Sequence, residues 1–139
     1  MIIDGIDIEA TYGVCMAEGA YKELWKLPVR KKGGYGFDWP EENGLEIDED
    51  EIVVYERLIY SVPMMIVAAN ETQYWTRMNS FLEWMLEKNI VVVDIPERNR
   101  RFYLQQLGFS GYDDYVDNGF SLFNMELAND NPSKFLPII

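Results

Sequence analysis

The amino-acid sequence predicts an α+β fold that is mainly β, in which one helix packs against a sheet. Strand-like segments stand on both sides of a single helical stripe of apolar residues over 71–88, and Asn-Gly turn signals occur at 43–44 and 118–119. A helix on one face of a sheet buries both apolar surfaces. The 139 residues suffice for one hydrophobic core, so we expect a single domain over 1–139.

The amino-terminal segment carries a loose period of two. Ile2, Ile6 and Ile8 fall on even positions within residues 1–12, which predicts a half-buried strand with a turn or bulge at Asp4-Gly5. Residues 20–27 predict one or two helical turns that end before Pro28, because a residue that precedes proline is disfavoured in a helix.

Residues 30–43 are predicted to form a loop. Three basic residues precede Gly33-Gly34-Tyr35-Gly36, but no Gly-Lys-Ser/Thr follows, so we interpret the glycines as a hairpin loop rather than a phosphate loop. Exposed aromatic residues beside cations are typical of interfaces. We therefore expect the loop to be mobile in an isolated monomer and ordered in an assembly. The candidate interface residues are Arg30, Lys31, Lys32, Tyr35, Phe37 and Trp39.

The helix is predicted over residues 71–88. Asn70 can cap its amino end with Gln73 at the capping-box position, and Lys88 and Asn89 suit its carboxyl end. Large aromatic residues in one stripe require cover, so we expect the whole stripe to be buried against the sheet. The stripe comprises Tyr74, Trp75, Met78, Phe81, Leu82 and Met85.

Further strands are predicted on both sides of this helix, where β-branched and aromatic residues cluster or alternate. They cover residues 52–67, 90–95, 101–107 and 120–128. Pro63 leaves open whether the first of these is one long strand or two strands joined there. In the last strand, Ser121, Phe123, Met125 and Leu127 share one side. Asn118-Gly119 predicts the hairpin turn that leads into it.

Composition excludes most catalytic chemistries. The chain has no histidine, which removes Ser-His-Asp triads, Cys-His dyads and the usual zinc and iron sites. The single Cys15 excludes an intramolecular disulfide and Cys-cluster metal sites, and it fits a reducing compartment. The acidic run 48–51 lacks the ligand spacing of an EF-hand. We therefore expect no enzymatic activity, no cofactor and no metal.

The formal net charge is 12 − 24 = −12. This balance argues against binding to nucleic acid or to anionic membranes, because both are polyanions. It is compatible with plain solubility, with an acidic wall past which nucleic acid moves, or with a DNA mimic. The sequence has no apolar run of 18 residues and no basic, apolar leader, so we expect neither a membrane span nor a signal peptide.

The order of several short motifs resembles the N-terminal domain of siphophage distal tail proteins. The opening motifs are Ile6-Asp7-Ile8, Tyr12-Gly13-Val14 and Gly19-Ala20-Tyr21 through Leu24. Then come Lys31-Lys32, the DWPEENG stretch at 38–44, Tyr55 to Ile59, the helix, Arg101 to Leu104, Phe120-Ser121-Leu122 and Asn131-Pro132-Ser133. The resemblance spans almost the whole chain and does not include the second, C-terminal domain usual in that family, so we expect a stand-alone version or a related tail component.

The resemblance implies a tail-tube-like β-sandwich or barrel with one flanking helix, assembled as a ring such as a hexamer. It implies a non-enzymatic tail protein of a phage or prophage, at the tail tube or its distal end, with other tail proteins as partners. Such a protein is assembled in the cytoplasm of the bacterial host and is located in the virion tail, where DNA passes through the lumen without tight binding. The alternative is an acidic inhibitor or DNA mimic with carboxylates spaced like phosphates.

Overall fold

The structure, a computed structural model, describes residues 1–31 and 53–139. Its strands are β1 (Ile2–Ile3), β2 (Ile6–Asp7), β3 (Val14–Met16), β4 (Leu58–Val67), β5 (Ile90–Ile95), β6 (Arg100–Tyr115) and β7 (Phe120–Asn129). Its α-helices are α1 (Ile8–Tyr12), α2 (Ala20–Leu24) and α3 (Glu71–Leu86), and two 3₁₀ turns are η1 (Pro96–Arg98) and η2 (Val116–Asn118).

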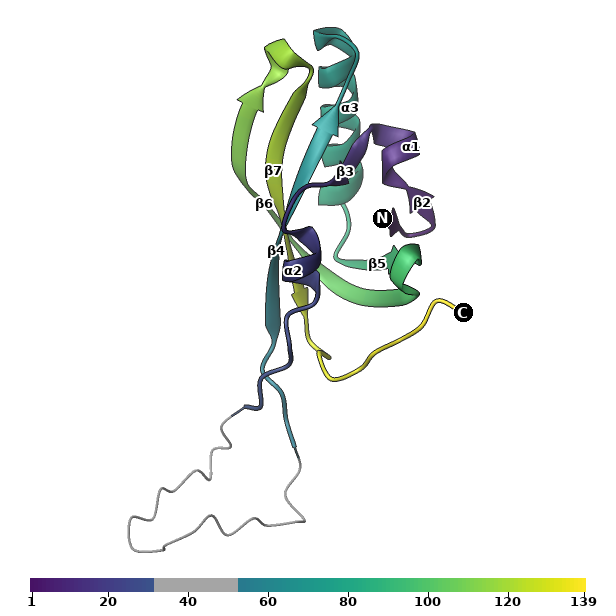
Figure 1. The fold of residues 1–139 in the computed structure, drawn as a ribbon, viewed down its shortest axis with the longest axis vertical. Helices are drawn as coiled ribbons and strands as arrows, with labels where there is room; N and C mark the ends of the chain where they lie inside the picture. The colour runs from purple at the N-terminus through teal and green to yellow at the C-terminus, as the bar shows by residue number, and fades with distance from the viewer. Residues whose placement is uncertain (32–52) are drawn as a thin grey trace, which may run out of the picture.

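The strands form one antiparallel sheet in the order β2-β1-β5-β6-β7-β4-β3. The helices contribute their buried residues to a single core on one side of this sheet, with α3 running beside the long strands (Figure 1). The fold is therefore α+β and mainly β, as the sequence predicts. The strands belong to one open sheet that ends in β2 and β3, rather than to the two sheets of a sandwich.

The amino-terminal segment differs from the single strand expected there. Two short strands pair around Asp4-Gly5, which is the predicted turn. The chain then enters α1, because the Asp7 carboxylate accepts hydrogen bonds from the backbone N–H groups of Glu9 and Ala10 and so caps a helix. The helix ends at Gly13. A side-chain cap thus overrides the weak period-two pattern.

The long hairpin β6–β7 and strand β4 form the centre of the sheet. Along β7 the predicted side, Ser121 to Leu127, faces the core, and along β4 the buried positions alternate from Tyr60 to Ile66. Strand β4 is one continuous strand that passes through Pro63. The Pro63 carbonyl accepts from the N–H of Ala17, which lies just beyond the end of β3. The nitrogen of Pro63 is therefore on the β3 side of the strand, past the last β3–β4 pair, so the absence of an N–H interrupts no ladder hydrogen bond.

Helix α3 begins where the sequence predicts, with the side-chain Oδ1 of Asn70 accepting from the backbone N–H of Gln73 at 2.8 Å. It ends at Leu86, two residues before the predicted end. Its buried face consists of Tyr74, Met78, Phe81 and Met85, while Leu82 is half-buried against the core.

The expected burial of Trp75 is wrong. Its side chain is 42% exposed and packs edge-on against Tyr74, with ring centroids 4.9 Å apart. Trp75 lies one position around the helix from the buried stripe and lines an open polar pocket beside η2. Because polar residues border that flank, the indole has no apolar cover on its outer side.

Candidate functional site

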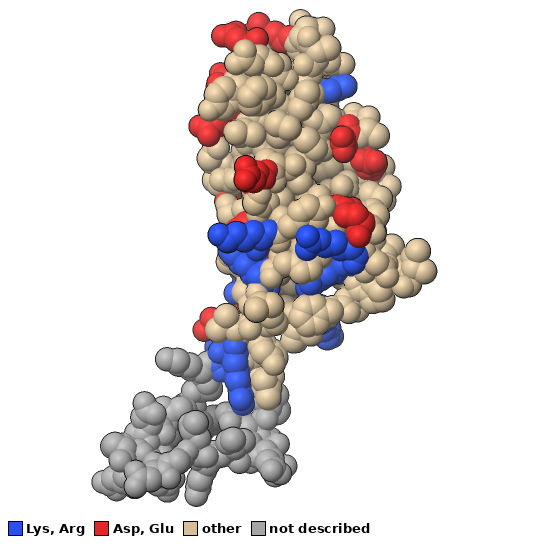
Figure 2. All heavy atoms as spheres, viewed as in Figure 1, with Lys and Arg blue, Asp and Glu red and all other residues tan. Residues whose placement is uncertain are grey.

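Basic side chains gather in one band of the molecule. Figure 2 shows Lys and Arg in this band across the lower part of the described chain, while Asp and Glu lie at the opposite tip and also along the surface between the tip and the band. Strand β6 joins these two ends, since Arg100 and Arg101 begin the strand and Asp113 and Asp114 lie near its end. At about 3.3 Å per residue, the two ends are separated by roughly 40 Å.

The basic end contains a cluster of arginine and aromatic side chains. The Arg98 guanidinium lies over the rings of Tyr21 and Trp25, with its Cζ 4.2 Å and 4.5 Å from their centroids. The Tyr21 hydroxyl donates a hydrogen bond to the Glu97 carboxylate, which raises the pKa of Tyr21 and lowers that of Glu97. We call Tyr21, Trp25, Arg98, Arg100, Phe102 and Phe135 the arginine–aromatic cluster.

Arg100 is the central cation of this cluster. Its Cζ lies 5.3 Å, 4.5 Å and 4.6 Å from the ring centroids of Trp25, Phe102 and Phe135. Its Nε is buried without a hydrogen-bond partner among the described residues. Burial lowers the pKa of Arg100, which remains a cation because an arginine pKa begins so high. The aromatic rings stabilise the charge in place of a carboxylate.

Of the three neighbouring arginines Arg98, Arg100 and Arg101, only one is paired with a carboxylate within the described residues. Arg101 forms a bidentate pair with Asp94, with Nε–Oδ1 and Nη2–Oδ2 distances of 2.7 Å and 2.9 Å. Within the described residues, no ion pair involves Arg98 or Arg100. The contact between Arg100 and Phe102 could have been predicted from the sequence, because both residues lie on one side of a period-two strand.

The acidic tip, which we define as Asp113, Asp114 and Asp117, lies at the turn between β6 and β7. All three side chains are exposed, and within the described residues none of them forms an ion pair. The side chains of Tyr112 and Tyr115 in the same hairpin are 46% and 43% exposed. The tip therefore presents both negative charge and aromatic surface.

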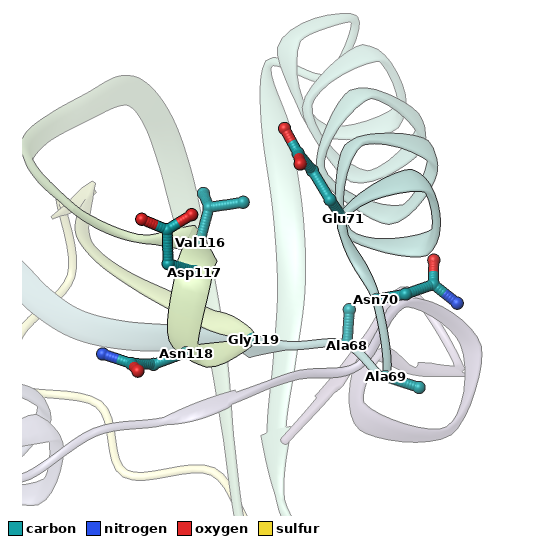
Figure 3. Close-up of a pocket in the computed structure, with 8 residues that line it drawn as sticks. All are labelled: Ala68, Ala69, Asn70, Glu71, Val116, Asp117, Asn118 and Gly119. Atoms are coloured by element: carbon teal, nitrogen blue, oxygen red, sulfur yellow. The ribbon is translucent and has the colours of Figure 1, made fainter.

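A shallow cavity of about 390 Å³ separates this tip from the amino end of α3 (Figure 3). Glu71 projects from the helix side and Asp117 from the side of η2, and small or amide residues form the rest of the lining. The two carboxylates disfavour an anion at the helix terminus. The lining holds no nucleophile with an adjacent base, so the cavity has no catalytic arrangement.

The predicted interface loop lies mostly outside the described residues. Lys32, Tyr35, Phe37 and Trp39 belong to 32–52, and so does most of the loop expected to be mobile over 30–43. Arg30 is bridged to Tyr55. The Lys31 N–H donates to the Val54 carbonyl at 2.7 Å. The two chain segments that flank 32–52 therefore run antiparallel beside the basic end.

The sheet has a second face that no described helix covers. On β4 this outer face carries Ile59 and Val67, which are 46% and 42% exposed, with half-buried Met65 between them. On β7 it carries Phe120 and Leu122, which pair with Val67 and Met65. The same face also carries the polar Ser61 on β4 and Asn124 and Glu126 on β7, with the Ser61 hydroxyl donating to Glu126 at 2.7 Å. Its apolar residues therefore form a patch near Val67 and Phe120 rather than an apolar face.

Neither the cysteine nor the carboxylates form a reactive centre in the described chain. Cys15 is half-buried on the edge strand β3, where burial first and the nearby Glu9 charge second raise the pKa of its thiol. The thiol is therefore protonated at neutral pH and a poor nucleophile. Residues 1–31 and 53–139 contain no cluster of three acidic or thiol side chains that could hold a metal ion. In the same residues, every helix is too short or too polar for a membrane span.

No protein-family model, curated protein or solved structure matches this chain. Three surfaces of the described chain are candidate sites: the arginine–aromatic cluster, the acidic tip and the apolar patch on the outer face of the sheet.

Proposed function

We propose that this chain is a non-enzymatic structural subunit of a phage or prophage tail that assembles with copies of itself into a ring. The observation that carries the proposal is an apolar patch on the outer face of β4 and β7. Val67, Met65, Phe120 and Leu122 form a continuous patch through their cross-strand pairs, and no described element covers it. A neighbouring subunit would bury this patch and gain about 25 cal/mol per Å² of apolar surface.

Two further features support self-assembly. From Leu107 onward, β6 pairs with β7 alone, so its other edge has no partner strand among the described residues. Such edges are surfaces on which strands of other subunits add. The net charge of −12 suits a ring through which DNA passes, because an acidic wall does not retain a polyanion. The order of the sequence motifs supports the placement in a tail.

The mass of the protein in solution tests the proposal. Size-exclusion chromatography with light scattering is expected to give a multiple of the 16.3 kDa chain, and electron microscopy is expected to show annular particles. Val67→Glu places a charge on the outer face and should lower this mass. Leu86→Glu alters an aliphatic residue on α3 that is 57% exposed, against 42% for Val67, and should leave the mass unchanged. A monomer at every accessible concentration would contradict the proposal.

An acidic inhibitor or DNA mimic would behave differently in the same experiment. It would stay a monomer or dimer and bind a basic DNA-binding protein in competition with DNA. A monomeric protein would therefore favour this alternative.

A further inference from the structure

The arginine–aromatic cluster has unused hydrogen-bonding capacity. Aromatic rings contact Arg98 and Arg100, but among the described residues neither guanidinium is paired with a carboxylate. The Nε of Arg100 is buried and has no hydrogen-bond partner there. Ring stacking engages the faces of a guanidinium and leaves its N–H edge without a carboxylate. On the exposed Arg98 that edge is open to another molecule, whereas the Nε of Arg100 is covered. A carboxylate is the group that this edge binds with two parallel hydrogen bonds.

The opposite end of the molecule offers suitable carboxylates. Asp113 and Asp117 are exposed and form no ion pair within the described chain. Tyr112 and Tyr115, both more than 40% exposed, flank them. Arginine and tyrosine are the residue types that contribute most to binding at protein interfaces. The tip therefore matches the cluster in charge and in aromatic character.

Within one chain the two sites cannot meet. Arg100 begins β6 and Asp113 lies near its far end, which separates them by roughly 40 Å along a continuous strand. The contact must therefore join two molecules, and it uses a different surface on each. When each chain uses its cluster on one neighbour and its tip on another, this contact is heterologous and propagates into a closed ring or a filament, whereas a two-fold pair that exchanges both contacts closes as a dimer.

We propose that the arginine–aromatic cluster binds the acidic tip of a second copy of this chain, with carboxylates of the tip on the free guanidinium edges and the tip tyrosines on the exposed Phe135. The proposal rests on the self-assembly proposed above and specifies which two surfaces form one of its contacts. Because charge complementarity also directs encounter, the contact weakens as salt is added.

Two variants test this contact by complementation. The tip variant, Asp113→Lys with Asp117→Lys, retains the cluster. The cluster variant, Arg98→Glu with Arg100→Gln, retains the tip. Each should weaken self-association about 30-fold or more, the cost typical of losing one partner of a buried charge pair. Mixed together they should associate, because the intact cluster of one can bind the intact tip of the other.

Controls separate this contact from general charge effects and from misfolding. Glu83→Lys with Glu87→Lys makes the same charge change as the tip variant on the exposed side of α3, and it should self-associate like the unmodified chain. Circular dichroism checks each fold. If the cluster variant misfolds, Arg98→Glu alone replaces it, because Arg98 is exposed and its removal opens no cavity.

The outcomes distinguish the two proposals. If the unmodified chain is a monomer, the proposed function fails and this contact fails with it. If the chain assembles but both variants assemble equally well, only the contact is overturned. If the cluster variant dissociates and the tip variant does not, the cluster binds carboxylates other than those of the tip, which also overturns it. Failure of the two variants to associate on mixing has the same consequence.

Discussion

The Tyr74 hydroxyl on α3 donates a hydrogen bond to the Ser121 Oγ on β7 at 2.7 Å, and both side chains are fully buried. The same hydroxyl lies 2.7 Å from that of Tyr112 on β6. Burial, followed by this bond, raises the pKa of Tyr112. One short polar network thus connects the helix to both strands of the long hairpin.

Tyr74→Phe should lower the free energy of unfolding by about 1–3 kcal/mol, because it leaves the buried Ser121 hydroxyl without its partner. Urea denaturation measures the change. The double variant with Ser121→Ala removes both polar groups and should recover part of the loss. Equal stability of Tyr74→Phe and the unmodified protein would show that the hydroxyl network contributes nothing.

Two residues on α3 should respond very differently to truncation. Phe81 is fully buried and contacts the rings of Tyr12, Phe109 and Phe123, so Phe81→Ala should cost about 3–5 kcal/mol. Trp75 is largely on the surface, so Trp75→Ala should cost about 1 kcal/mol or less. Thermal or urea unfolding measures both losses of stability. A loss for Trp75→Ala as large as that for Phe81→Ala would place the indole in the core.

Gly119 and Gly5 form a matched pair for testing backbone geometry. Both have positive φ, +83° and +81°, so alanine is strained at either site by about 1–2 kcal/mol. An added Cβ at Gly119 would lie 2.8 Å from the Ala68 carbonyl oxygen, whereas at Gly5 it would meet nothing within 4 Å. Gly119→Ala should therefore be the more destabilising in urea unfolding. Equal losses would mean that the chain shifts freely around Ala68.

Asp4 should make stability depend on pH at the acid end. Burial alone would raise its pKa, but hydrogen bonds from Lys88 and the Val92 N–H, with the Lys88 charge, hold the pKa below its ordinary value of 3.8. A lowered carboxyl pKa contributes stability that is complete above the unfolded value and is lost as the pH falls through the folded value.

Asp4→Asn tests this dependence, because asparagine tolerates the positive φ of 50° and still accepts from Val92. The variant should be less stable than the unmodified protein at neutral pH, and the difference should shrink below about pH 4. Urea unfolding at several pH values measures it. A difference that stays constant down to the lowest pH would exclude the carboxylate charge as its cause.

Duplex DNA should not bind measurably at physiological salt. The net charge of −12 repels a polyanion, and within the basic end Arg101 is already paired with Asp94. Fluorescence anisotropy with a labelled duplex checks this. A micromolar complex that weakens steeply with added salt would contradict it, and with it the acidic-lumen argument.

The sequence by itself determined the features that depend on neighbouring residues. The Asn70 cap, the stripe from Tyr74 to Met85, the turn at Asn118-Gly119 and the core side of β7 all follow from local spacing and turn chemistry. Together they predict the α+β class. The prediction from local signals was wrong where a helix cap and a period-two pattern overlap. At residues 8–12 the Asp7 cap forms a helix inside the alternating pattern.

Only the tertiary structure decided which side chains meet across long separations. Trp25 and Arg100 are far apart in sequence, and their contact arises because α2 packs beside the start of β6. The sequence shows a group of three arginines among abundant carboxylates, but it cannot show that aromatic rings surround two of them and a carboxylate only the third. The exposure of Trp75 has the same origin, since burial depends on what lies opposite a side chain and not on its place in a periodic pattern.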